Sequence, residues 1–256
     1  MAKTNNLTDF LTSLAAKFRA KLGTSGTINP QDFESKVDAV FEAGKKSEYD
    51  AFWDAYQSNG TRTDYYFAFA GKGWTQTNLK PKYTARPSEA RAMFSSNTDI
   101  TDLTLTGKFD FSAVTAITDC MAWSSVTKVP SINLSNARSS PNAIAKAKSL
   151  VTVENLIFPT SPFTVNISDF FYLCYALENI TITGTIQNTG FDLHWSTKLT
   201  IESLTSILTA LSKNSSVAAG KSITFPTAAQ AKIQANTTAK GQYDAAIAAG
   251  WTIAFS

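Results

Sequence analysis

The chain has 256 residues, of which 43% are hydrophobic and only 17% are charged, and its formal net charge is +3. A charge this small, with its signs mixed along the chain, argues against the concentrated basic face that nucleic-acid binding needs. No run approaches the roughly 18 apolar residues of a membrane span, and no apolar run after Lys3 has the length of a secretory signal. We therefore expect no membrane insertion, no nucleic-acid partner and folding in a cytoplasm.

Residues 1–60 are expected to form three short helices. Apolar residues over 7–22 are spaced three or four apart, which favours an amphipathic helix. A second helix is expected to end at Gly44, and a third, capped by Ser47, to close at Gly60. We interpret this segment as an anchoring or oligomerisation module. A helical cap on the rest of the same chain is the equal alternative.

Residues 61–90 are expected to form an aromatic connector. Tyr65, Phe67 and Phe69 alternate with their neighbours at a period of two, which predicts a strand, and Gly71 interrupts the pattern. Two interpretations of these aromatic side chains stay open. They pack in a core, or they lie on a ligand-binding surface.

A block recurs through residues 91–200 with a period of 24 to 27 residues, and its first apolar anchors are Ile100, Val126, Leu150 and Leu177. Each anchor is followed by a short β-like run. A fixed period of this size indicates stacked supersecondary units, none of which can bury its apolar face alone. The expected fold class is therefore α+β, with short N-terminal helices before a repeat solenoid.

Two copies of the block are well formed. The runs LTLTG (103–107) and ITITG (180–184) are both predicted strands. Between these copies, residues 141–150 are expected to contribute a short helix, and residues 191–195 to form a last, incomplete unit.

Residues 201–256 have the features of a C-terminal capping unit, because the open end of a stacked array has to be covered. The pattern predicts a helix at 201–212, a strand at 222–226, a helix at 227–249 and a final strand at 251–255.

The sequence carries little catalytic chemistry, and we expect no enzyme, no cofactor and no metal site. His194 is the only histidine, so a His-pair metal site is not possible, and neither a GxSxG elbow nor a complete phosphate-binding glycine loop is present. A carboxylate pair of the glycosidase type stays open, since spatial pairs are invisible in a sequence. Cys120 and Cys174, the only two cysteines, are expected to be reduced and buried.

Four aromatic side chains of the repeat region are candidates for ligand binding: Trp123, Tyr172, Tyr175 and Trp195. Aromatic rings that cluster on a surface mark binding sites, and these could stack on sugars if they face outward. Packing in the core, or between repeat units, is the other interpretation.

The run MFSSNTDITDLTLTGKFDFSAVTAITDCM resembles the leucine-rich-repeat units of BspA-like bacterial surface proteins. Those units read as a Met-Phe pair, a short polar turn, an apolar strand and an Asp/Ser-rich return. Residues 170–184 match the same pattern. The resemblance implies a BspA-like leucine-rich-repeat solenoid, here closed by an α/β C-terminal cap.

The order of the whole chain resembles structural proteins of phages and prophages of gut Firmicutes, in which a helical start precedes such an array. The similarity lies in the start AKLGTSGTINPQDF and in the closing patterns TIESLTSILTAL and GWTIAF. It implies a non-enzymatic virion protein of fibre, appendage or decoration type, assembled in the bacterial host cytoplasm. The implied partners are other virion proteins, further copies of the chain (a trimer is expected) and a host-surface glycan or protein. The alternative is a bacterial cell-surface leucine-rich-repeat adhesin, which would need an export signal.

Overall fold

The computed structural model describes residues 33–138, 140–159, 167, 169–187, 192–214 and 221–256, together with Ala16, Lys17 and Ala20. The chain divides into two compact units, residues 1–59 and 60–256, and each is described by itself. The expected mixed α+β composition is confirmed, with a helix in the first unit and parallel sheets in the second. The helix expected over 7–22 lies almost entirely outside the described residues.

Among the described residues of the first unit, the long helix α2 runs without a break over Phe33–Tyr56. The prediction that Gly44 ends one helix and Ser47 caps another was wrong. A glycine inside a helix costs only about 1 kcal/mol relative to alanine, which the good helix formers around it offset. The helix ends where Ser58 and Asn59 adopt φ of 48° and 52°, a left-handed conformation that stops a helix.

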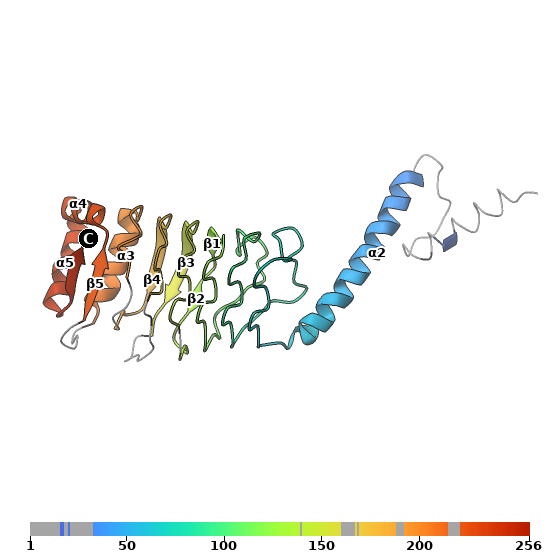
Figure 1. Cartoon of the computed structure of the whole chain (residues 1–256), viewed down its shortest axis with the longest axis horizontal. Helices are drawn as coiled ribbons and strands as arrows, with labels where there is room; N and C mark the ends of the chain where they lie inside the picture. The colour runs from blue at the N-terminus through green and yellow to red at the C-terminus, as the bar shows by residue number, and fades with distance from the viewer. Residues whose placement is uncertain are drawn as a thin grey trace, which may run out of the picture. The chain divides into compact units, whose positions relative to one another are not determined.

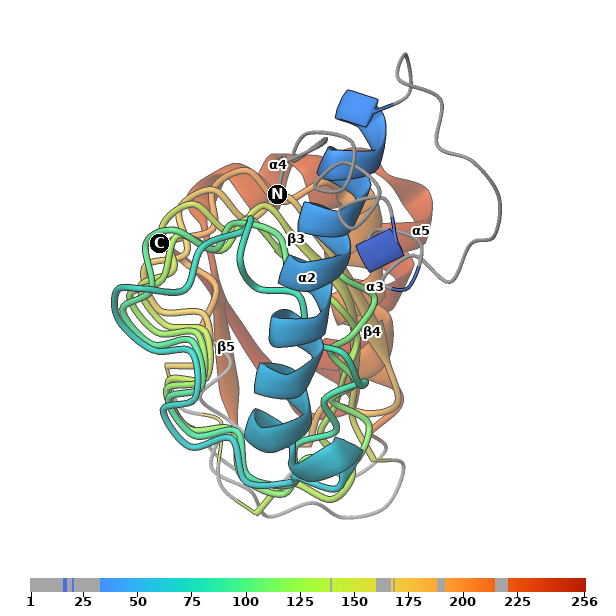
Figure 2. The same ribbon diagram turned by 90° about the vertical axis from the view of Figure 1, so that its right-hand side faces the viewer.

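The second unit is a stack of parallel coils, where a coil is one circuit of the chain. Backbone hydrogen bonds between residues 63 and 200 join segments that lie 22 to 28 residues apart along the chain. Figure 1 shows successive coils side by side, and Figure 2, which looks along the stack, shows them overlying one another. Each coil therefore contacts its neighbours in the sequence, as the period predicts.

The regular strands of the stack are short and all parallel. They are β1 (Lys128–Val129), β2 (Ile132–Asn133), β3 (Thr152–Ile157) and β4 (Asn179–Thr183). β3 lies between β4 on one side and both β1 and β2 on the other. Isolated bridges such as that of Glu89 with Ala116 continue the pairing into the earlier coils.

The core runs along the inside of the stack. The four predicted anchors, Ile100, Val126, Leu150 and Leu177, are all completely buried, which confirms the period. The strand predicted at ITITG is confirmed as β4, but the strand predicted at LTLTG is wrong. Asp102 and Phe111 form bridges to Lys128 and Ile132 of the next coil, so the chain from Asp102 to Phe111 is longer than the chain that it lies beside. The extra residues loop out, and Leu105 is 71% exposed.

One edge of the stack is built from a repeated turn rather than from strands or helices. Its residues alternate, one N–H donating to the next coil and the following N–H closing a local turn, as Phe94 donates to Cys120 and Ser95 to Ala92. The alternation places two residues four positions apart in the left-handed region, with φ between 50° and 68°. These pairs are Phe67 and Gly71, Ala92 and Ser96, Asp119 and Trp123, Asn142 and Lys146, and Asp169 and Leu173.

This turn corrects two predictions. Residues 65–70 do not form a strand: Tyr65 and Phe69 are buried, whereas Phe67 has φ of 52° and is 55% exposed. Residues 141–150 do not form a helix, because the N–H groups of Ile144 and Lys146 donate to the next coil instead of to their own. The spacing of apolar residues in this turn resembles both the period of two that is typical of a strand and the period of three to four that is typical of a helix.

The cap at the C-terminal end has the elements that the sequence predicts, with one difference. They are α3 (Ile201–Ser212), β5 (Ser222–Phe225), α4 (Thr227–Ala235), α5 (Thr237–Ala248) and β6 (Thr252–Phe255). The helix expected over 227–249 is two helices, because the extended backbone at Asn236 interrupts it and the Asn236 side chain caps α5 by accepting the N–H of Ala239.

Side chains accept backbone N–H groups on both sides of the ladder. On β4, the hydroxyl of Ser203 accepts the N–H of Ile180 at 2.9 Å, and the hydroxyl of Ser206 accepts the N–H of Ile182 at 2.8 Å. At the other end, the amide oxygen of Gln76 accepts the N–H of Thr101, as a backbone carbonyl does in later coils. Exposed strand edges invite further pairing, and these particular N–H groups are not available for it.

Candidate binding surface

The four aromatic side chains predicted as a binding set gather on the turn edge of the stack. These four side chains come from three separate parts of the sequence. Together with Lys146 and His194 they form one surface, here called the aromatic surface: Trp123, Lys146, Tyr172, Tyr175, His194 and Trp195. The segments that carry them follow one another in the stack, because Trp123 donates its N–H to Ala145 and Lys146 donates its N–H to Tyr172.

Trp123 and Lys146 occupy equivalent left-handed positions of adjacent coils, with φ of 56° and 62°. The Lys146 ammonium lies 4.6 Å from the centre of the Trp123 ring and 6.0 Å from that of Tyr172. A cation at these distances is attracted to a ring face by about 0.5–1 kcal/mol at an exposed site. Lys146 therefore links the Trp123 ring to the rest of the surface.

Trp195 is the centre of the other half of the surface. The rings of Tyr172 and Tyr175 meet it edge to face, with centroids 6.3 Å and 5.7 Å away and interplanar angles of 82°. The His194 ring lies 4.3 Å from the Trp195 ring, and its Nδ1 is 2.7 Å from a carboxylate oxygen of Asp192. These contacts fix the orientation of the rings.

The rings differ in how much of them faces solvent. Trp123 is 50% exposed and Tyr175 is 39% exposed, while Tyr172 and Trp195 are half-buried. Neither interpretation made from the sequence holds for the whole set, since the half-buried rings pack and the outer ones are open. Surface packing of this kind holds exposed rings in place at little cost in side-chain entropy.

Polar groups flank the rings. Asp119 and Asn142 occupy the first left-handed position of the turn in two adjacent coils. Burial raises the pKa of the Asp119 carboxyl, against the opposing effects of a hydrogen bond from Asn142 and the positive charge of Lys146. Among the described residues, neither Oδ1 of Asp119 nor Nε1 of Trp195 has a hydrogen-bond partner, although both atoms are buried.

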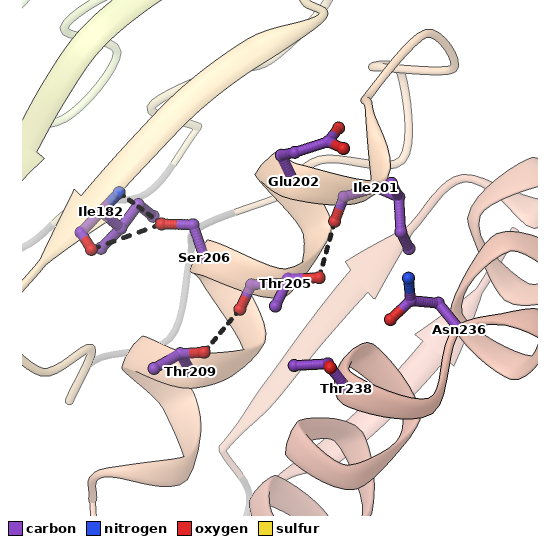
Figure 3. A pocket seen from close by; sticks show the side chains of 8 residues that line it. All are labelled: Ile182, Ile201, Glu202, Thr205, Ser206, Thr209, Asn236 and Thr238. Carbon is purple, nitrogen blue, oxygen red and sulfur yellow. Dashed lines mark hydrogen bonds between the residues drawn. The ribbon is translucent and has the colours of Figure 1, made fainter.

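Apart from the aromatic surface, a hollow lies against α3. It has a volume of about 450 Å³ and is lined by Ile182, Ile201, Glu202, Thr205, Ser206, Thr209, Asn236 and Thr238. Figure 3 shows its hydroxyls turned back onto the backbone, Thr205 donating to Ile201 and Thr209 donating to Thr205, each at 2.7 Å. Because these groups already serve the helix, the hollow offers few free polar atoms to a ligand.

The two cysteines are free thiols, both buried, as expected from the sequence. Burial raises the pKa of Cys174 to about 12, and it raises that of Cys120 further. Such thiols are protonated at neutral pH and are poor nucleophiles.

The described part of the chain contains no cluster of three or more histidine, cysteine or acidic side chains that could hold a metal ion. None of its helices is long and apolar enough to cross a membrane. Comparison with known protein families, curated proteins and solved structures finds no match to this chain.

Proposed function

We propose that the chain is a non-enzymatic structural protein of a bacteriophage particle, of fibre, appendage or decoration type. In this proposal residues 1–59 attach the protein to the particle, and residues 60–256 form a BspA-like leucine-rich-repeat solenoid that is displayed. The observation that carries the proposal is the division into a helical unit and a unit of stacked coils, which is the chain order of the phage proteins that the sequence resembles.

The stacked unit supports a display role by its construction. Its core is a continuous apolar interior, and the side chains of Gln76, Ser203 and Ser206 accept backbone N–H groups beside the strand ladder. N–H groups that are satisfied in this way are not available for pairing with another chain. Stacked units of this type present extended surfaces.

The helical unit supports an attachment role. Helix α2 carries the aromatic residues Tyr49, Phe52, Trp53 and Tyr56 near its C-terminal end, where Phe52 stacks on Tyr56 with ring centres 5.6 Å apart and is 46% exposed. Exposed aromatic rings on a helix are suited to contacts with other subunits. The partners in this proposal are other virion proteins and further copies of the chain, with a trimer as the expected assembly.

The test is to delete residues 1–59 in the strain that carries the gene and to follow the protein through density-gradient purification of particles. We expect full-length protein in the particle fraction and the truncated protein in the soluble fraction, with circular dichroism showing that the truncated protein keeps its fold. Normal incorporation of the folded truncation would refute the attachment role. Recovery of full-length protein in the cell envelope would instead favour the bacterial adhesin.

A further inference from the structure

We propose that the aromatic surface binds a neutral, linear oligosaccharide that lies along the axis of the stack. This inference rests on the proposed display of residues 60–256, and it assigns the ligand class of the displayed surface. The surface comprises Trp123, Lys146, Tyr172, Tyr175, His194 and Trp195, flanked by Asp119 and Asn142.

The first argument is the placement of the rings. Sugar rings bind to aromatic faces through their C–H groups, and Trp123 and Tyr175 are each exposed by more than a third. These rings stand on different coils, and Trp195 lies on the segment beyond. Neighbouring parallel segments are about 4.8 Å apart, which is comparable to the length of one sugar unit in an extended chain. An oligosaccharide along the stack axis can therefore meet one ring after another.

The second argument is the held geometry of the rings. The Trp123 ring is fixed by the Lys146 ammonium at 4.6 Å, and the Tyr175 ring meets Trp195 edge to face at 5.7 Å. A surface that is already ordered loses little conformational entropy when a ligand binds. Exposed apolar groups that gather on one surface mark interaction sites.

The third argument is the unmet polar capacity of the same surface. Oδ1 of Asp119 and Nε1 of Trp195 lack hydrogen-bond partners among the described residues. An unsatisfied buried polar group costs about 1–3 kcal/mol. A sugar that packs on the exposed rings brings hydroxyls, which both donate and accept hydrogen bonds, next to the residues that carry these two groups.

The charges at the surface favour a neutral ligand. Lys146 is the positive group that faces the rings, and it is set against the carboxylates of Asp119 and Asp192. An anionic polymer such as a teichoic acid would meet these carboxylates, whereas a neutral glycan would use them as hydrogen-bond acceptors.

A matched control exists on the same edge of the stack. Tyr66 is 52% exposed and lies under the guanidinium of Arg91, 5.5 Å from the ring centre, so it reproduces the exposed ring and the cation. It stands apart from the aromatic surface, on the first coil. If the ligand binds to the aromatic surface, the Tyr66→Ala variant should bind it with the same affinity as the parent protein.

The experiment measures binding of the purified full-length protein to an array of neutral bacterial polysaccharides and to neutral hexasaccharides of glucose, galactose, rhamnose and N-acetylglucosamine. Glycerol-phosphate teichoic acid provides the anionic arm. Hits are quantified by calorimetry for the parent, Trp123→Ala, Tyr175→Ala and Tyr66→Ala, and circular dichroism checks each fold. We expect binding to at least one neutral glycan, weakened about tenfold or more by each of the first two variants and unchanged by Tyr66→Ala.

Three results would overturn the proposal: no neutral glycan bound at millimolar concentration, binding to the teichoic acid alone, or equal affinity of the parent and the folded Trp123→Ala and Tyr175→Ala proteins. Failure here is separable from failure of the virion role. Glycan binding by free protein does not need a particle, and incorporation into the particle does not need Trp123 or Tyr175. Particles that incorporate Trp123→Ala normally but no longer adsorb to cells would support both.

Discussion

Two neighbouring coils approach closely at Gly184, and replacing this residue tests whether the stack depends on that approach. The residue follows β4, has φ of +92°, and a Cβ built on it would lie 1.9 Å from the carbonyl oxygen of Phe158 on the adjacent coil. The Phe158 N–H also donates to Thr183 at 2.8 Å. A side chain at Gly184 therefore forces the two coils apart at a backbone hydrogen bond.

The sequence provides a control in the equivalent motif. Gly107 ends LTLTG as Gly184 ends ITITG, and it also has positive φ, at +57°, but a Cβ there meets nothing within 4 Å. Gly107→Ala should cost only the strain of a left-handed alanine, about 1–2 kcal/mol. Gly184→Ala adds overpacking against backbone and a weakened hydrogen bond, for a total of about 3–6 kcal/mol.

The assay is thermal unfolding of the purified full-length protein, followed by circular dichroism. For a domain of this size 1 kcal/mol corresponds to about 2–4 °C in Tm. Gly184→Ala should therefore melt at least about 4 °C below Gly107→Ala, and both should melt below the parent. Equal melting temperatures for the two variants would refute the reasoning, because they would mean that the close approach of the coils contributes nothing.

The remaining predictions concern the cap, a carboxyl and a thiol. Ser203→Ala removes the hydroxyl that accepts from Ile180 and donates to Glu178 at 2.9 Å, so it should lower the free energy of unfolding by about 1–3 kcal/mol in urea titrations; an unchanged midpoint would contradict the capping role. Burial raises the pKa of Asp119, so the folded state loses stability as the pH rises through that pKa. Asp119→Asn should therefore raise the Tm more at pH 7 than at pH 3, and the same gain at both values would argue against it. Cys174, whose pKa burial raises to about 12, should react with a thiol reagent at pH 8 only after denaturant is added, and rapid labelling of the native protein would show that it is accessible.

The buried side of the stack was predictable because its buried residues are apolar and recur in the sequence at a regular spacing. Ile100, Val126, Leu150 and Leu177 recur at the spacing of one coil, and all four are buried. Helix α3 and strand β5 were predictable for the same reason, since Leu204, Ile207, Leu208 and Leu211 recur on one buried face of α3 and buried residues alternate along β5. The break at Asn236 was missed because alanine-rich flanks hide it.

The turn edge was not predictable from apolar spacing, because its conformation is set by hydrogen bonds between coils. Its left-handed positions are occupied by residues as different as Phe67, Ala92 and Trp123, which carry no turn signal. A partial signal is present at Asp119, Asn142 and Asp169, since Asp and Asn adopt positive φ more readily than other residues. Helices were predicted on both sides of Gly44, but the continuity of α2 was missed for the opposite reason, because a local stop signal at Gly44 was overridden by its neighbours.

The candidate binding residues could be chosen by residue type, but the sequence did not show that they lie together on one surface. Trp123 and Trp195 lie far apart in the sequence, and only the stacking of coils brings their contacts, Lys146 and Tyr172, into one chain of interactions. Sequence spacing gives the order of the coils, but it does not say which residue of a turn faces outward. That direction depends on φ at each position, and two residues of each turn, four positions apart, lie in the left-handed region.

The repeated turn also separates the exposed side chains from the buried ones. Within one turn, Met121 is completely buried and donates its N–H to the next coil, while Trp123, two residues on, is 50% exposed and held by the same kind of bond. The bonds that keep the coils in register are made by backbone atoms, so they are indifferent to the exposed side chain. An exchange at Trp123 should therefore change what the surface binds without changing how the stack folds, whereas an exchange at the buried Met121 should destabilise the stack. A protein that displays a binding surface needs this division, because the surface can then diverge while the interior that supports it stays fixed.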